Sequence, residues 1–154
     1  VQIAKAMGAE VHSVCGPGNV QFVESLGSDS TYSYRDQIAT EINLSFDSVF
    51  DVFGKFTRSA FSRQLGKSGI YVSTVPKAAT LLAEGIARFG ITKVSRLVQV
   101  RSQSDDLKQI KEWIENGLIV PHLEKVYPAE KAADAHRHIE SKRTVGKICI
   151  KFSS

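Results

Sequence analysis

The turn after the first predicted strand combines glycines with a helix-capping residue, a pattern typical of anion binding. Residues 10–15 (EVHSVC) alternate polar and apolar side chains as a strand does, and Gly16-Pro17-Gly18-Asn19 follows directly. Asn often caps a helix, and the free N–H groups of a helix N-terminus attract phosphate. Gly16 and Asn19 are therefore candidate residues for binding a phosphate-bearing ligand. The alternative is an ordinary turn in which Asn19 only caps the helix.

Two further predicted strands end in residues that could contact a ligand. Residues 46–53 (FDSVFDVF) are followed by Gly54, and residues 69–75 (GIYVSTV) end at Pro76. Ligands of open parallel sheets bind at the carboxyl ends of strands, and a glycine there allows close approach to the backbone. The candidates at these two ends are Phe53, Gly54, Thr74 and Val75. For Phe53, a place in the core is the alternative.

The remaining reactive side chains show no catalytic or metal-binding spacing. Cys15 and Cys149 lie far apart in apolar, strand-like runs, which indicates buried free thiols and no zinc site. We expect His136 on the apolar side of its helix and His138 towards the other side, neither with a nucleophile or metal nearby. Asp47 and Asp51 are interpreted as strand-end residues and not as an acid/base pair.

Helical and extended segments alternate along the chain, which predicts βαβ units, a parallel sheet and an α/β fold. Helices are predicted over residues 1–7, 19–26, 57–65, 81–89, 104–116 and 128–139. Strands or extended segments are predicted over residues 10–15, 31–34, 46–53, 69–75, 97–100, 120–127 and 147–152.

Composition is that of an ordinary globular domain. Of the 154 residues, 42% are hydrophobic and 23% charged, and the net charge is +4. The basic residues are scattered, so no nucleic-acid partner is expected. No apolar run approaches the ~20 residues that a membrane span needs, so no membrane partner is expected either.

Three stretches together resemble a known family. They are VQIAKAMGAEVHSVCG through ESLGSDSTYSYRD (1–36), FDSVFDVFGK with LGKSGIYVSTVP (46–76), and IENGLIVPHLEKVYPAEKAADAHRHIESKRTVGKICI (114–150). In order and spacing they resemble the medium-chain dehydrogenase/reductase superfamily (zinc-binding dehydrogenases), in particular its quinone oxidoreductase-like branch.

The resemblance implies a Rossmann-type, doubly wound parallel sheet without its first strand and Gly-rich loop. Residues 1–100 would form part of a dinucleotide-binding domain, and residues 101–154 the C-terminal helices and the strand that returns to the catalytic domain. The absent strand would be the central one, and its loss would expose two strand edges. The chain would then be a C-terminal fragment with little or no activity alone.

The same resemblance implies an NAD(P)-dependent oxidoreductase that reduces quinones, enones or similar activated double bonds. The turn at Gly16 has no acidic residue for ribose hydroxyls, which favours NADP(H), with Arg35 as a substitute phosphate ligand. In similar reductases a tyrosine at the position of Tyr34 lies near the adenosine phosphate. In some relatives the turn with Gly146 and Lys147 reaches the cofactor. An ordinary strand-end tyrosine and a solvated lysine are the alternatives.

Other functions stay open at this point. The parent protein could instead be a zinc-dependent alcohol dehydrogenase, an enoyl-reductase domain of a multidomain synthase, or a non-catalytic relative acting as an interaction protein. Nothing in this stretch supports zinc. We expect a small-molecule substrate, a homodimer paired through residues 97–100, and a cytoplasmic location unless an upstream segment targets an organelle.

Overall fold

The chain divides into two compact units. The computed structural model describes residues 1–76, 95–98, 103–141 and 143–152, without the Lys67 side chain. One unit spans Val11–Ser102, and the other combines Val1–Glu10 with Gln103–Ser154. The helix predicted over residues 81–89 lies outside the described residues, as do the last two residues of the strand predicted over 97–100.

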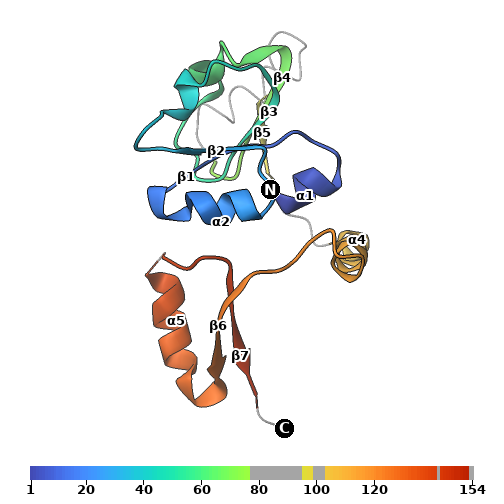
Figure 1. The fold of residues 1–154 in the computed structure, drawn as a ribbon, viewed down its shortest axis with the longest axis vertical. Helices are drawn as coiled ribbons and strands as arrows, with labels where there is room; N and C mark the ends of the chain where they lie inside the picture. The colour runs from blue at the N-terminus through green and yellow to red at the C-terminus, as the bar shows by residue number, and fades with distance from the viewer. Residues whose placement is uncertain (77–94, 99–102, 142, 153–154) are drawn as a thin grey trace. The chain divides into compact units, whose positions relative to one another are not determined.

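The unit Val11–Ser102 begins with a parallel β-α-β arrangement. Strand β1 (His12–Cys15) pairs in parallel with β2 (Ser30–Ser33), from His12 opposite Ser30 to Cys15 opposite Ser33. Helix α2 (Val20–Ser25) connects them and contacts both strands (Figure 1). It ends before Gly27, whose φ of 91° is a left-handed conformation that glycine adopts without a Cβ penalty.

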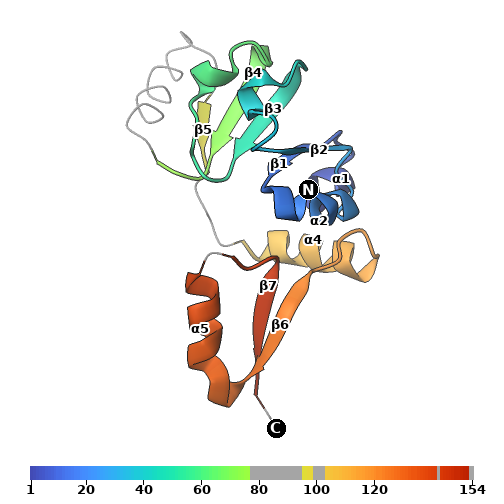
Figure 2. The ribbon, with the colours of Figure 1, turned by 60° about the vertical axis from the view of Figure 1, so that its left-hand side comes forward.

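A second parallel sheet in this unit has the strand order β3-β4-β5 (Figure 2). Its strands are β3 (Phe46–Asp51), β4 (Leu65–Ser73) and β5 (Ser95–Leu97). Within the described residues β1 pairs only with β2, and β3 only with β4. The His12 and Phe46 rings meet edge to face, with centroids 5.3 Å apart. The parallel α/β fold is confirmed, with an unpaired edge on both β1 and β3.

The helix predicted over residues 57–65 is wrong. A 3₁₀ turn covers only Arg58–Phe61, and Leu65 already belongs to β4. Leu65 is fully buried with Phe61 and Tyr71 in the core of this unit. The Gln64 side-chain amide donates a hydrogen bond of 3.2 Å to the Ile42 carbonyl, and the Gln64 backbone carbonyl accepts one from the Phe46 N–H at 2.7 Å. These long-range bonds hold the chain extended where the local pattern favours a helix.

The other unit contains a two-stranded parallel sheet covered by a helix. Strand β6 (Leu123–Pro128) pairs with β7 (Lys147–Lys151), and α5 (Ala132–Glu140) contacts both (Figure 1). Helix α4 (Ser104–Glu115) carries Asp105 and Asp106 in its first turn, as predicted, where the helix dipole favours acids.

Helix α1 (Gln2–Ala6) belongs to the same unit as the C-terminal elements. The Gln2 amide donates to the Val120 carbonyl at 3.0 Å and accepts from the Val120 N–H at 2.6 Å. This pair of hydrogen bonds joins residues that are 118 positions apart in sequence. The predicted domain boundary near residue 100 stays a prediction.

Two of the predicted N-cap positions are correct, but neither side chain makes the expected capping hydrogen bond. Asn19 is the N-cap of α2, but its side chain makes no capping hydrogen bond. Thr57 precedes only the short 3₁₀ turn and also makes none. Gln103, and not Ser104, is the N-cap of α4. Among the described residues, no helix combines the length and the apolar character needed to cross a membrane.

Candidate functional site

Two predicted binding residues lie side by side at the carboxyl ends of β1 and β2. The Tyr34 N–H donates to the Cys15 carbonyl at 3.0 Å, which continues the strand pairing past the end of β1. A Cβ built on Gly16 would lie 3.5 Å from the Tyr34 hydroxyl oxygen. The Tyr34 side chain is 54% exposed. A ligand at this edge could therefore reach the hydroxyl and the glycine turn together.

The turn from Gly16 to Asn19 is partly closed by its own backbone. The Gly16 carbonyl accepts the Asn19 N–H at 2.9 Å within the 3₁₀ turn Pro17–Asn19. One N–H that was expected to face an anion is therefore occupied. A Cβ on Gly18 would meet nothing within 4 Å, so this position opens to solvent. Arg35 is exposed, and among the described residues its guanidinium has no ion pair or hydrogen bond.

The ends of β3 and β4 bring Gly54 against Val75. Gly54 has φ of 59°, and a Cβ built on it would lie 2.5 Å from the Val75 Cβ. Only glycine fits this position without strain, because both the backbone conformation and the space exclude a side chain. Phe53 beside it is 87% exposed, so its alternative role as a core aromatic is wrong. The predicted residues of the two strand ends therefore form one surface.

Thr74 links the same two strand ends. Its N–H donates to the Asp51 carbonyl at 3.3 Å, and its hydroxyl donates to the Val52 carbonyl. Ser73, which is almost fully buried, lies with its hydroxyl 3.2 Å from the Val75 N–H. The two Thr74 bonds hold the start of the turn after β3 from the β4 side.

Asp51 holds the turn after β3 from the other side, a role that the sequence did not reveal. Its carboxylate accepts the N–H of Phe53 at 3.1 Å and that of Phe56 at 2.9 Å. The Tyr71 hydroxyl oxygen lies 2.7 Å from the same carboxylate and 2.9 Å from the Phe56 carbonyl oxygen. Asp51 therefore organises the loop of residues 52–56, which carries Phe53 and Gly54.

The surroundings of Asp51 and Tyr71 shift the pKa of both side chains. Burial by itself would raise the pKa of the Asp51 carboxyl, but the hydrogen bonds donated to it hold the pKa below its ordinary value. For Tyr71, burial and then the hydrogen bond to Asp51 raise the pKa of the phenol. The pair is thus a carboxylate and a neutral phenol at neutral pH.

Gly146 and Lys147 form a tight turn in the other unit. Gly146 has φ of 89°, and a Cβ there would lie 2.5 Å from the His122 carbonyl oxygen, which also accepts the Lys147 N–H at 2.9 Å. The Val145 N–H donates to the Glu124 carboxylate at 2.7 Å. The turn belongs to the unit that contains residues 103–154, and Lys147 is exposed.

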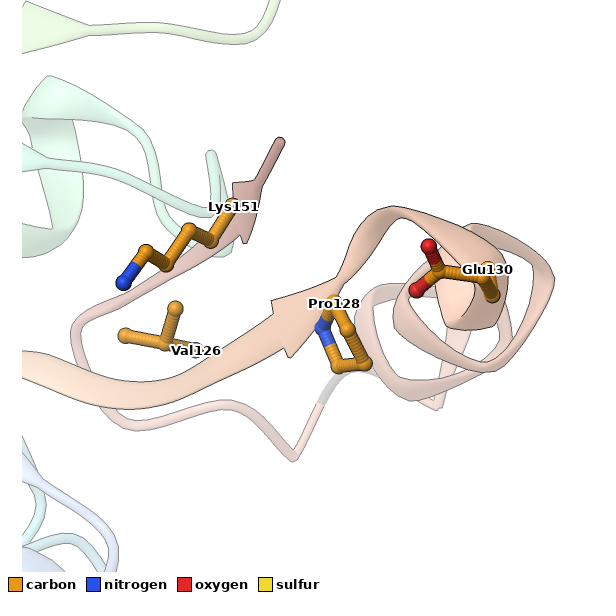
Figure 3. A pocket seen from close by; sticks show the side chains of 4 residues that line it. All are labelled: Val126, Pro128, Glu130 and Lys151. Carbon is orange, nitrogen blue, oxygen red and sulfur yellow. The ribbon is translucent and has the colours of Figure 1, made fainter. Parts of the chain in front are cut away.

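Shallow hollows in this unit lie along β6, α5 and β7. Figure 3 shows one lined by Val126, Pro128, Glu130 and Lys151, none of which was predicted as a site residue. Another is lined by Ile139, Thr144, Gly146, Lys147 and Ile148. Of the two hollows, only the second contains predicted residues.

The predicted orientation of the two α5 histidines is wrong. His136 is exposed, whereas His138 is half-buried and lies between β6 residues. Its Nδ1 is 2.9 Å from the Tyr127 hydroxyl oxygen, and its Nε2 is 3.2 Å from the Glu124 carboxylate. The small Ala135, 2% exposed, lets α5 approach the sheet closely on this side. His138 faces the sheet because its ring pairs with the polar side chains of Tyr127 and Glu124 on β6. The apolar periodicity of α5 alone does not predict this orientation.

The cysteines also differ from expectation. Both are free, but Cys149 is exposed and Cys15 only half-buried, so the prediction of two buried thiols is wrong. Alternation along β7 turns Ile148 and Ile150 inward and Cys149 outward. Burial, followed by the charge of Glu24, raises the pKa of the Cys15 thiol. In the described part of the chain, no group of three or more His, Cys, Asp or Glu residues could hold a metal ion.

Comparisons with known proteins identify relatives for this arrangement. The model of the zinc-binding dehydrogenase family matches residues 26–150. The chloroplast envelope quinone oxidoreductase homolog of Arabidopsis thaliana is 23% identical over 97% of this chain and 47% of its own length. The chloroplastic NADPH-dependent alkenal/one oxidoreductase of the same plant is 25% identical over 97% of this chain and 36% of its own length.

A solved structure shares the fold. The quinone oxidoreductase from Coxiella burnetii superposes with a TM-score of 0.77 at 20% identity, over 98% of this chain and 47% of that protein. The chain thus spans about half the length of the curated relatives it matches, or less.

Proposed function

We propose, because this chain belongs to the zinc-binding dehydrogenase family, that the protein containing it is a nicotinamide-dependent oxidoreductase of quinones, enones or similar activated double bonds. The relatives whose names mention quinones and alkenals or enones support this substrate class. One structural observation carries the proposal. The ends of β3 and β4 meet where Gly54 packs on Val75, at the edge of a parallel sheet where nucleotides bind.

The residues at the strand ends fit a dinucleotide in two places. Gly16 and the exposed hydroxyl of Tyr34 offer a turn and a hydrogen-bonding group for the adenosine phosphate end. Gly54, where any Cβ would collide with Val75, offers bare backbone to the nicotinamide ribose. Thr74 and Val75 extend this surface towards the carboxamide. Gly146 and Lys147 are also proposed as cofactor-binding residues, with the lysine as a point charge for phosphate.

When bound, the nicotinamide supplies the hydride chemistry, and the residues of this chain bind and orient it. The loop of residues 52–56 is held by Asp51 on one side and by Thr74 on the other, so the backbone at Gly54 is fixed before a ligand arrives. Such preorganisation lowers the entropic cost of placing a reacting group. We assign no side chain of this chain to proton transfer.

We propose NADPH as the preferred cofactor. The turn of residues 16–19 carries no acidic side chain that would repel a 2′-phosphate, and Arg35 is exposed shortly after Tyr34. The relative named for NADPH agrees with this preference.

Isothermal calorimetry of the complete protein with NADPH and with NADH tests the proposal. Tight NADPH binding with weak NADH binding supports a reductase of activated double bonds. A preference for NADH favours a zinc-dependent alcohol dehydrogenase instead. If neither nucleotide binds, the assignment as an oxidoreductase is refuted, and a non-catalytic relative that acts through interactions is favoured.

A charge introduced at Gly18 locates the 2′-phosphate. We expect Gly18→Asp to weaken NADPH binding about 10-fold and NADH binding much less, because an added carboxylate repels the extra phosphate. Gly66→Asp is the matched control, since a Cβ at either glycine meets nothing within 4 Å. Equal effects of the two substitutions would place the phosphate elsewhere.

We propose that residues 1–154 alone have little or no activity, because the relatives are at least twice as long. Turnover of an enone with NADPH by the purified chain contradicts this. The homodimer through residues 97–100 also stays a proposal. Sedimentation of the complete protein tests it directly, and a monomer contradicts the homodimer. A proline at Val98 would not test the dimer alone, because the Val98 N–H donates to the Ser73 carbonyl at 2.9 Å within the sheet.

A further inference from the structure

One side chain, that of Asp51, is hydrogen-bonded to the backbone of the loop of residues 52–56 at two places. The Asp51 carboxylate accepts the backbone N–H of Phe53 at 3.1 Å and that of Phe56 at 2.9 Å. These two donors lie on either side of Gly54. A single carboxylate therefore sets the path of the whole loop.

The Tyr71 hydroxyl holds that carboxylate in place from inside the core. Tyr71 is 1% exposed, and its ring stacks on Phe61 with centroids 6.0 Å apart. Its hydroxyl oxygen lies 2.7 Å from the Asp51 carboxylate and 2.9 Å from the Phe56 carbonyl oxygen. The buried ring cannot turn away without disturbing the core, so the carboxylate is oriented by a fixed group.

We infer that Asp51 and Tyr71 act together as positioning residues, which hold the loop of residues 52–56 in the conformation that receives the nicotinamide half of the cofactor. This inference rests on the proposed function. It concerns one half of the cofactor only, because the adenosine half is assigned to the separate surface at Gly16 and Tyr34. Neither Asp51 nor Tyr71 is assigned a contact with the substrate.

The inference can be tested because the two halves of the cofactor are assigned to different surfaces. Calorimetry of the complete protein compares NADPH with 2′,5′-ADP, which lacks the nicotinamide ribose. We expect Asp51→Asn to weaken NADPH binding about 10-fold, because an amide in place of the carboxylate removes charge-assisted bonds to the loop. Binding of 2′,5′-ADP should change less than about twofold.

Two further variants keep the comparison interpretable. Tyr71→Phe keeps the ring in the core and removes only the hydroxyl, and we expect NADPH binding to weaken about 3-fold. Asp47→Asn is the control for the loss of a charge on the same strand, because Asp47 is exposed and its side chain makes no hydrogen bond or ion pair in the described residues. It should leave both affinities unchanged.

The outcomes separate this inference from the proposed function. NADPH binding that is unchanged in Asp51→Asn overturns the inference and leaves the proposed function intact. Equal weakening of both ligands also overturns it, since that pattern indicates a general loss of structure. If the unaltered protein binds neither ligand, the proposed function fails first, and the inference fails with it.

Discussion

Replacing Gly54 with alanine should destabilise the ends of β3 and β4 by about 2–5 kcal/mol. The backbone term comes from φ of 59°, where a Cβ costs about 1–2 kcal/mol. The packing term arises because the new Cβ would lie 2.5 Å from the Val75 Cβ. Ordinary carbon contacts are about 3.5–4.0 Å, and such overpacking costs about 1–3 kcal/mol.

Peptide-resolved hydrogen exchange of the complete protein measures this locally, because it reports the free energy of opening around each site. Gly117→Ala isolates the backbone term, since Gly117 has φ of 71° and a Cβ there meets nothing within 4 Å. The double variant with Val75→Gly should recover part of the packing term. If Gly54→Ala costs no more than Gly117→Ala, the close contact with Val75 is refuted.

Three other perturbations have expected outcomes. Gly146→Ala should destabilise β6 and β7 by about 2–5 kcal/mol in the same exchange experiment, because its Cβ would lie 2.5 Å from the His122 carbonyl oxygen; a cost equal to that of Gly117→Ala contradicts this. Thr74→Val should loosen the loop of residues 52–56 by about 0.5–1.5 kcal/mol, through the lost bond to the Val52 carbonyl, and unchanged exchange there would count against that bond. The pKa of Asp51 is lowered by folding, so its contribution to stability is complete above the unfolded value of about 3.9 and is lost as pH falls through the lower folded pKa. Amide chemical shifts of the loop should follow that acid transition and lose it in Asp51→Asn.

Helix ends were predictable from the sequence because their causes are local. Gly8, Gly27 and Gly117 all follow helices and have φ between 71° and 91°, a conformation that glycine adopts most easily. The parallel pairing was predictable too, because strands separated by helical segments require crossovers. The structure confirms it for β1 with β2 across α2, and for β6 with β7 across α5. Strands β3 and β4 also pair in parallel, although only a 3₁₀ turn lies between them.

Some of the neighbours at the strand ends were predictable from the sequence, whereas their role as a binding site stays a prediction. The rule that ligands bind at the carboxyl ends of parallel strands selected Gly54 and Val75, which the structure brings into contact. Gly16 and Tyr34, the latter selected by resemblance, are also neighbours. Asp51 was missed because its role depends on the Tyr71 hydroxyl, 20 residues further along the chain.

By itself, the sequence determined the α/β class, the order of most elements and the glycine turns that end them. These features depend on the spacing of apolar side chains and on local backbone conformation, which are properties of neighbouring residues. Only the tertiary structure decided that Leu65 extends β4, that His138 faces Tyr127 and that Cys149 faces solvent. Each of these depends on partners far along the chain. Burial and buried hydrogen bonds outweigh the small local preferences of a few residues, which is why the local pattern alone placed all three wrongly.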